Sequence, residues 1–411
     1  MTVNFCSENT MTLFVHDSQT LKNHPIKKTI IQVAVVAIMA TAAVGCSRGI
    51  KPVVNDPVKL VQIAQPVSVL QPVFSVNAGK NTSKKDPLDL QIGYDNGQVV
   101  VAGRDGSLTG FDNAGQRLWS FDIGEDITGG VALDVFSQTA VISTRSGQIV
   151  AVDSATGEVR WKKQLTGSVL TPALINSNRV ILSANDGVLH GLSLQNGQSV
   201  WQFATRVPAI SVRGAAEPTL LDDKTALVAT ADGRLHAITV DSGLPQWSRR
   251  IGIGTGSSEV ERMSDVDGMP IVDNGQLFAI SYSGQLIGID LASREVKFVN
   301  EVASLKSLAV SSQQVIATTL EGNVVAYNRN TGEQLWQSDE LAYRQLTNPA
   351  LIGNYLAVGD LDGIVHLFDP ATGTIVSRVE TKGALSSLKV EGSRLMTQSK
   401  SGQVAIWQIA R

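Results

Sequence analysis

The chain has 411 residues, enough for two or three ordinary domains, and 43% of them are hydrophobic. Its 34 basic and 37 acidic residues nearly balance, at a formal net charge of −3, so the basic excess typical of nucleic-acid binding is missing. Both cysteines, Cys6 and Cys46, stand near the N-terminus. This placement excludes a disulfide or a thiolate metal site from the rest of the sequence.

Residues 1–45 are expected to be a signal segment. Residues 22–28 include basic side chains, and residues 29–44 form a small, apolar run that ends at Gly45-Cys46-Ser47. The residues up to Cys46 are similar to a bacterial lipobox, although Ala43 stands where the lipobox usually has Leu. The similarity implies that Cys46 receives lipid and becomes the mature N-terminus. Because Ser47 is not the Asp of an inner-membrane retention signal, the outer membrane is the expected destination.

An uncleaved membrane anchor is the alternative to a lipoprotein signal, but the apolar run is shorter than the ~20 residues that a membrane span needs. The stretch before the basic residues is long for a signal, which makes Met11 a second candidate for the translation start. Residues 46–68 contain Pro52, Pro57 and Pro66 among polar and aliphatic residues and are expected to form an extended tether.

Residues 69–411 repeat one unit of about 40 residues. Residues 146–161 show its central part: a turn ending in Gly147, an apolar strand, a second turn at Thr156-Gly157, and a strand carrying Trp161. The first turn glycine recurs eight times, at Gly106, Gly147, Gly187, Gly233, Gly284, Gly322, Gly363 and Gly402. An aromatic residue follows it by 13 or 14 positions at Trp119, Trp161, Trp201, Trp247, Phe298 and Trp336, whereas Ser377 replaces it after Gly363.

Each unit is expected to contain four short antiparallel strands, as a β-propeller blade does. The strand after each turn glycine is mostly apolar, with a small residue where another layer would pack closely. Asp-Gly or Ser-Gly forms most of the turns that precede this strand, and such pairs favour tight hairpins. Helical spacing is absent from this part of the sequence.

The two ends of the repeat region are predicted to close a ring. The last unit lacks an outer strand because the sequence stops at Arg411, and residues 72–76 look like an outer strand without a blade. Pairing the two removes two exposed strand edges. The sequence therefore predicts an all-β protein, an eight-bladed β-propeller of four-stranded antiparallel blades over residues 69–411, in which an N-terminal strand completes the last blade.

Residues that could carry chemistry recur at fixed places in the repeat and are therefore expected to be structural. The repeated tryptophans should pack between blades rather than bind a ligand. An aspartate stands six positions after the turn glycine at Asp112, Asp153, Asp290 and Asp369, which favours a role in the turn over catalysis. A histidine stands three positions after it at His190, His236 and His366, in units that do not all adjoin, so no shared metal site is expected.

Two connections are longer than the repeat requires. Gly187 and Gly233 are 46 positions apart, and Gly233 and Gly284 are 51 apart, against 38 to 41 elsewhere. The additional residues fall in residues 205–217 and 251–268. Both connections leave an outer strand and enter the next unit's inner strand, so they are expected to lie side by side on one face.

The two long connections combine apolar and charged residues. Ile210, Val212 and Arg213 lie in the first, and Asp265 and Asp267 in the second. Such a mixture would give a partner-binding patch with a hydrophobic centre and a charged rim. In the alternative, which is compatible with the first, Arg213 neutralises Asp265 or Asp267 within the protein. The acidic residues match no calcium-loop spacing.

Together with Cys46 and the eight units, residues 208–214 and 262–267 resemble the BamB family, the lipoprotein subunits of the bacterial outer-membrane β-barrel assembly machine. The resemblance covers nearly the whole chain after the signal segment. The two loop segments carry most of it, because quinoprotein dehydrogenases share the repeats. It implies a scaffold without catalytic residues, cofactor or metal, which aids the folding and insertion of outer-membrane proteins.

The same resemblance implies a partner. BamB proteins bind BamA, the barrel subunit, through its periplasmic POTRA domains, and unfolded outer-membrane proteins are a second candidate partner. The positions that match the contact residues are Ile210, Val212, Arg213, Asp265 and Asp267.

Two other functions are weaker alternatives. A quinoprotein-like dehydrogenase would resemble its family in having a vicinal cysteine pair over the cofactor, which this sequence lacks after Cys46. A periplasmic sensor propeller would be accompanied by a transmembrane or kinase segment, and none is recognised.

Overall fold

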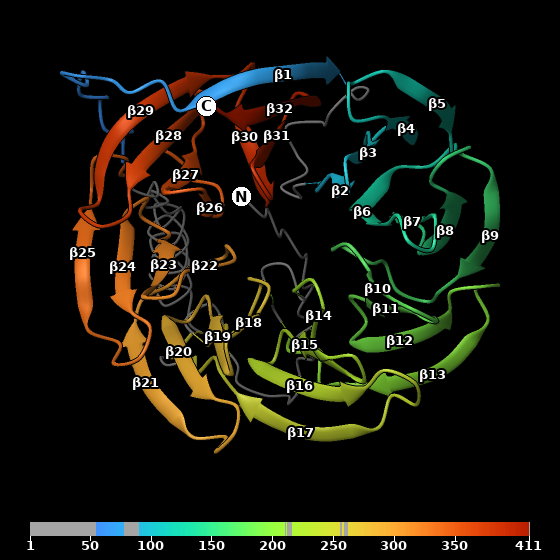
Figure 1. Cartoon of the computed structure of the whole chain (residues 1–411). Helices are drawn as coiled ribbons and strands as arrows, with labels where there is room; N and C mark the ends of the chain where they lie inside the picture. The colour runs from blue at the N-terminus through green and yellow to red at the C-terminus, as the bar shows by residue number, and fades with distance from the viewer. Residues whose placement is uncertain are drawn as a thin grey trace, which may run out of the picture. The chain divides into compact units, whose positions relative to one another are not determined.

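The computed structural model describes residues 55–77, 90–209, 211, 216–254, 257–258 and 262–410, all within the unit Asn55–Arg411. The regular elements of these residues are all strands, and they form eight four-stranded sheets arranged in a ring (Figure 1). The predicted all-β, eight-bladed β-propeller is therefore confirmed. No helix in this part of the chain is long and apolar enough to cross a membrane.

The first four blades each consist of four strands consecutive in sequence, numbered from the ring's centre outwards. Blade 1 contains β2 (Gly93–Asp95), β3 (Gln98–Ala102), β4 (Ser107–Phe111) and β5 (Arg117–Asp122). Blade 2 contains β6 (Ile127–Asp134), β7 (Thr139–Thr144), β8 (Gln148–Asp153) and β9 (Val159–Gln164). Blade 3 contains β10 (Leu174–Asn176), β11 (Arg179–Ser183), β12 (Val188–Ser193) and β13 (Ser199–Ala204). Blade 4 contains β14 (Thr219–Asp222), β15 (Thr225–Ala229), β16 (Arg234–Thr239) and β17 (Pro245–Arg250).

The remaining blades follow the same order, except that the last one takes its outer strand from the start of the propeller. Blade 5 contains β18 (Ile271–Asp273), β19 (Gln276–Ile280), β20 (Gln285–Asp290) and β21 (Val296–Glu301). Blade 6 contains β22 (Ala309–Val310), β23 (Gln314–Thr318), β24 (Val324–Asn328) and β25 (Gln334–Ser338). Blade 7 contains β26 (Ala350–Ile352), β27 (Tyr355–Gly359), β28 (Ile364–Asp369) and β29 (Thr374–Glu380). Blade 8 contains β30 (Leu385–Glu391), β31 (Arg394–Ser399), β32 (Gln403–Ile409) and β1 (Leu70–Asn77).

The middle strands form the core because both of their faces pack against neighbouring blades. Every residue of β15, β19 and β23 is buried. The turn before each third strand needs glycine, as blade 2 shows. Gly147 has φ +85°, and a Cβ there would lie 2.8 Å from the Gly167 carbonyl oxygen, so both the conformation and the close approach favour glycine.

A recurring contact seals most of the seams, the interfaces between consecutive blades. The aromatic residue of one blade packs on a positive-φ glycine in the last turn of the next blade. A Cβ on that glycine would lie 2.4 to 2.6 Å from the ring, in the pairs Trp119–Gly157, Trp161–Gly197, Trp201–Gly243, Phe298–Gly332 and Trp336–Gly373. Each of the four tryptophans also donates an indole N–H bond of 2.7 to 2.8 Å across its seam, to the carbonyls of Ser154, Leu194, Val240 and Pro370, respectively. The predicted packing of these tryptophans between blades is confirmed.

The ring closes where β1 pairs antiparallel with β32, with Leu70 opposite Ile409 and Val76 opposite Val404. This pairing confirms the predicted completion of the last blade by an N-terminal strand. It also supplies an aromatic residue that the repeat alignment missed. Phe74 of β1 packs on Gly115 of blade 1, where a Cβ would lie 2.5 Å from the ring. The seam between blades 8 and 1 is therefore of the common type.

Residues 55–69, here called the strap, lie against the outer part of the propeller before β1 begins. The Val67 amide donates to the Val376 carbonyl at 3.0 Å, and the Ser377 hydroxyl donates to the Val67 carbonyl. Leu60 and Ile63 pack against the hydrophobic cluster of blades 6 and 7. Ser377 stands at the position of the repeat aromatic, so at the seam between blades 7 and 8 an extended chain segment binds where other blades place a ring.

A buried ion network in blade 7 supports the strap. Arg344, whose side chain is 5% exposed, donates through Nε to Asp360 at 2.8 Å and through its terminal nitrogens to Asp362 and to the Val58 carbonyl. His366 is bonded through Nε2 to Asp360 at 2.9 Å. Burial opposes ionisation of Asp360, but hydrogen bonds from His366, the backbone and Arg344 outweigh this effect and lower the carboxyl pKa.

A second arginine extends this network to the strap. Arg378 donates through Nε to His366 Nδ1 at 3.1 Å and through a terminal nitrogen to the Val61 carbonyl at 2.6 Å. Because Nδ1 of His366 accepts a bond, a neutral imidazole with its proton on Nε2 satisfies both contacts. Burial lowers the pKa of His366, which favours the same neutral form.

Candidate functional site

The two long connections lie side by side, as their positions in consecutive blades predict. They border a cavity of about 410 Å³, here called the loop groove. The first connection contributes four consecutive residues and the second contributes two, while blade 4 forms the rest. The lining residues are Arg206, Val207, Pro208, Ala209, Asp232, Arg250, Arg262 and Ser264.

The loop groove is cationic and has apolar residues at its edge. It contains three arginines, Arg206, Arg250 and Arg262, against one carboxylate, Asp232. Asp232 already accepts a hydrogen bond of 2.6 Å from the Thr230 hydroxyl. Val207 is 50% exposed. An exposed apolar side chain beside several arginines is typical of a protein-binding surface rather than of a catalytic centre.

Asp265 and Asp267 lie inside the protein, with 0% and 5% exposure. Alternation of apolar and charged residues predicted that their carboxylates would form an exposed rim. Instead, the backbone turns inward here, because the Asp265 carbonyl accepts the Tyr282 amide at 2.8 Å and the Met269 amide donates to the Ser307 hydroxyl at 3.0 Å. The predicted exposed rim is therefore not formed by these two carboxylates. Their predicted contact with a partner stays a prediction.

The other predicted site residues fall outside the described ranges. Ile210, Val212 and Arg213 belong to the undescribed part of the first connection, and Cys46 precedes the described residues. Their predicted roles in partner contact and lipidation therefore remain predictions. The described flanks, residues 205–209 and 216–217, place both ends of the first connection on blades 3 and 4.

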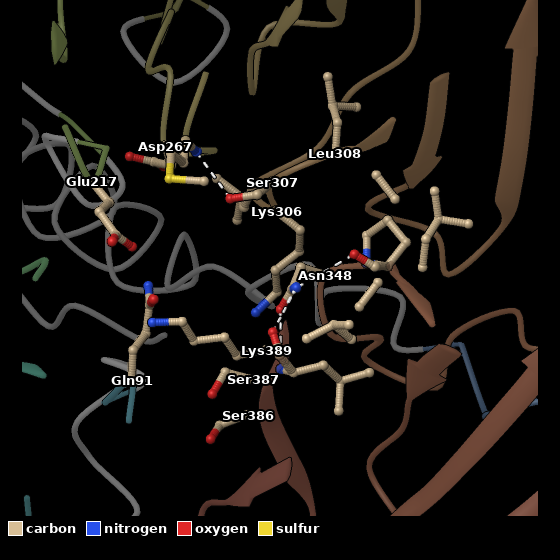
Figure 2. Close-up of a pocket in the computed structure, with 18 of the residues that line it drawn as sticks. Gln91, Glu217, Asp267, Lys306, Ser307, Leu308, Asn348, Ser386, Ser387 and Lys389 are labelled. Carbon is tan, nitrogen blue, oxygen red and sulfur yellow. Dashed lines mark hydrogen bonds between the residues drawn. The ribbon is translucent and has the colours of Figure 1, made fainter. Parts of the chain in front are cut away.

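A second cavity of about 380 Å³, the axial pocket, lies where segments before the innermost strands of several blades converge (Figure 2). Its walls are largely aliphatic on the side of blades 6 to 8. Charged groups face it from three loops, with Glu217, Asp267 and Lys306, and from β30, with Lys389. Blades 7 and 8 are tied together here, because the Asn348 amide donates to the Leu388 carbonyl at 2.9 Å and accepts the Leu388 amide at 3.2 Å.

Glu217 is a carboxyl group of the axial pocket with a strongly shifted pKa. Burial raises its pKa to about 7, although the positive charge of Lys389 acts in the opposite direction. Near neutral pH this side chain is therefore divided between its neutral and charged forms. No sequence motif marks this pocket, because its residues come from blades that are far apart along the chain.

The repeated polar residues have the structural roles that their spacing predicts. The Asp153 carboxylate accepts the amides of Ala155 and Thr156 at 2.9 and 3.0 Å, closing the last turn of its blade. His190 and His236 are buried in separate blades, and burial lowers the pKa of both. Within the described ranges no three His, Cys, Asp or Glu residues lie close enough together to hold a metal ion.

The fold and its seams define a class: closed eight-bladed β-propellers built from repeats in which an aromatic ring of one blade packs on a turn glycine of the next. Within that class, the sequence profile of the family described as "Outer membrane protein assembly factor BamB" matches residues 104–338 and 320–410. This match covers more than half of the chain. The chain belongs to the BamB family.

Individual relatives agree with this assignment. The crystal structure of BamB from Moraxella catarrhalis is 44% identical, with a TM-score of 0.78, and the alignment covers 83% of this chain and 100% of that one. BamB of Burkholderia pseudomallei is 29% identical over 343 residues, covering 83% of this chain and 88% of the relative. BamB of Escherichia coli is 28% identical over 319 residues, covering 74% of this chain and 81% of the relative.

The same fold occurs in an enzyme. Quinohemoprotein alcohol dehydrogenase from Comamonas testosteroni has a TM-score of 0.64 over 83% of this chain and 77% of that one, with 12% identity. At this identity the likeness extends to the fold alone. It shows that the blades by themselves do not decide the function.

Proposed function

We propose that this protein is a non-enzymatic scaffold of the outer-membrane β-barrel assembly complex, and that its loop groove binds the POTRA domains of BamA. One observation carries the proposal: the two connections that lengthen the spacing between turn glycines meet in one cationic groove with an exposed apolar edge. The names of its relatives as outer membrane protein assembly factors support the same role.

The groove offers two kinds of interaction to a folded domain. Arg206, Arg250 and Arg262 would attract carboxylates on the partner, and arginine can bind them in a bidentate manner. Val207, with Ile210 and Val212 of the same connection, would bury apolar surface beside them. Asp265 and Asp267 would hold the second connection in the shape that this binding needs.

Charge reversal in the groove tests the proposal. We expect Arg206→Glu combined with Arg262→Glu to weaken the affinity for purified BamA POTRA domains about tenfold or more, because each change replaces attraction with repulsion. The affinity is measured by biolayer interferometry. The control is Arg117→Glu, an exposed position on β5 in blade 1. Equal affinities for the groove variant, the control and the wild type, with unchanged thermal midpoints, would reject the groove as the binding site.

We further propose that the protein is anchored to the periplasmic face of the outer membrane by lipid on Cys46. The lipobox-like residues up to Cys46 and the family to which the chain belongs support this anchor. Mass spectrometry of the mature N-terminus tests it. An unmodified Cys46, or a mature chain that retains the segment before it, would contradict lipidation.

A further inference from the structure

One seam departs from the repeat, and no described chain segment takes the place of the missing contact. Between blades 4 and 5, Arg294 stands where the aromatic–glycine seams have the turn glycine, and it adopts φ +60°. At the glycine seams a Cβ would lie only 2.4 to 2.6 Å from the facing ring, so Arg294 cannot allow the same close approach to Trp247. Among the described residues, Trp247 donates no hydrogen bond to blade 5, unlike the four other seam tryptophans.

The result is a cavity of about 370 Å³ at this seam, here called the seam pocket. The indole of Trp247 and the aliphatic side chains of Leu221, Ile289 and Leu291 give it apolar walls. Polar groups from both blades complete the lining, namely Asp222, Gln246, Ser248, Arg249 and Arg294. A cavity of this size with a few polar groups at its edge is typical of a binding pocket.

The protein itself shows what can occupy an altered seam. At the seam between blades 7 and 8 it is the aromatic residue that is replaced, and the strap binds there. The Val67 amide donates to the Val376 carbonyl, and the Ser377 hydroxyl donates to the Val67 carbonyl. The outer strand β17 of blade 4 presents the same free edge as β29 of blade 7, because each is the last strand of its sheet. An extended polypeptide segment therefore fits the geometry of the seam pocket.

The charges of the pocket select the kind of segment. Arg249 donates to the Arg294 carbonyl at 2.8 Å, and neither guanidinium forms an ion pair among the described residues. Asp222 caps its own turn by accepting the Lys224 amide at 2.8 Å. Two arginines and the free indole N–H of Trp247 would together recognise carboxylates, while the apolar walls would hold an aliphatic or aromatic side chain.

We propose that the seam pocket between blades 4 and 5 binds an extended, acidic polypeptide segment of a partner. One apolar side chain of the segment enters the pocket, and its carboxylates contact Arg249 and Arg294. This site is distinct from the loop groove and does not depend on binding of POTRA domains there.

The test uses the mature, full-length propeller and short fluorescent peptides, with fluorescence anisotropy as the readout. The probe alternates Leu and Asp, and the comparison peptide alternates Leu and Lys. We expect saturable binding of the acidic peptide. The affinity for the basic peptide should be lower by about tenfold or more. Absence of saturable binding of the acidic peptide, or equal binding of both, overturns the proposal.

Two variants place the binding in the seam. Arg294→Gly restores the residue of the common seams, so the pocket should close and affinity for the acidic peptide should fall about tenfold, while the thermal midpoint stays equal or rises. Arg249→Glu should cause a similar loss. Lys163→Glu, the matching position at the sealed seam between blades 2 and 3, is the control and should bind like the wild type. Retained affinity in both seam variants overturns the proposal.

Discussion

At the scale of single residues, the seam glycines show how strictly the repeat is constrained. Gly197 has φ +70°, and a Cβ there would lie 2.5 Å from Trp161. Its replacement combines backbone strain with a steric clash against a buried ring that also donates a hydrogen bond to Leu194. The same packing geometry is repeated from seam to seam. This repetition, rather than any chemistry of the tryptophan, explains why the same residues recur.

We therefore expect Gly197→Ala to lower the free energy of unfolding by about 2–4 kcal/mol, since it adds positive-φ strain to overpacking. Gly275→Ala is the matched control, because Gly275 has a similar φ of +74° with nothing within 4 Å of its added Cβ. The control should cost about 1–2 kcal/mol from strain alone. Denaturant unfolding measures both, and equal losses would show that the clash with Trp161 contributes nothing.

Glu217 makes stability depend on pH. Its native pKa of about 7 lies above the unfolded value of about 4.3, so the native state binds the proton more tightly. The stabilisation is complete below about pH 4.3 and is lost as the pH rises through about 7. We expect Glu217→Gln to flatten this part of the pH profile of the unfolding free energy. The exposed Glu333→Gln should leave the profile as in the wild type, and an unchanged slope in Glu217→Gln would contradict the assignment.

At the scale of structural elements, two arginines hold the strap through its backbone carbonyls, one from the connection before blade 7 and one from β29. Arg344 binds the Val58 carbonyl at 3.0 Å and Arg378 binds the Val61 carbonyl at 2.6 Å. Hydrogen bonds from charged donors are stronger than neutral ones, by roughly a factor of two. The point at which the N-terminal segment joins the propeller is therefore fixed by side chains more than 280 positions later in the sequence.

Removing one of these donors should loosen the strap locally. We expect Arg378→Ala to speed hydrogen exchange at the Val67 amide about tenfold or more, because a charged hydrogen bond contributes about 1.5–3 kcal/mol. The amides of β27, in the core of the same blade, should keep their protection. Lys382→Ala, an exposed position just after β29, serves as the control. If the Val67 amide exchanges in the Arg378→Ala variant at the same rate as in the wild type, this arginine does not hold the strap.

At the scale of the whole molecule, the blade count and the closing of the ring follow from spacing alone. The turn glycines occur at nearly equal intervals, and the unpaired strand at each end of the repeat has only the other as a partner. Phe74 could not be assigned by the same alignment, because it precedes the first turn glycine by more than 30 positions. Its role depends on a pairing between the two ends of the chain.

The candidate site was predictable only in part. Unequal spacing located the two long connections and their proximity, since consecutive blades present equivalent loops on one face. The burial of Asp265 and Asp267 was not predictable, because residue alternation does not show whether a loop folds outward or inward. The seam pocket needed the structure as well: Arg294 differs from glycine in the sequence, but the space that this difference opens is a property of packing.

The pairing of β1 with β32 also imposes an order on folding. β1 is synthesised first, yet its partner, residues 403–409, lies more than 320 positions later, at the very end of the chain. Contacts between such distant segments form slowly, because a long loop must close before they contribute. Blades 1 to 7 can assemble while the chain is incomplete, but the last interface forms only with an intact C-terminus. Closure of the ring thus works as a length check: a polypeptide truncated before residues 403–409 would keep unpaired strand edges exposed to aggregation.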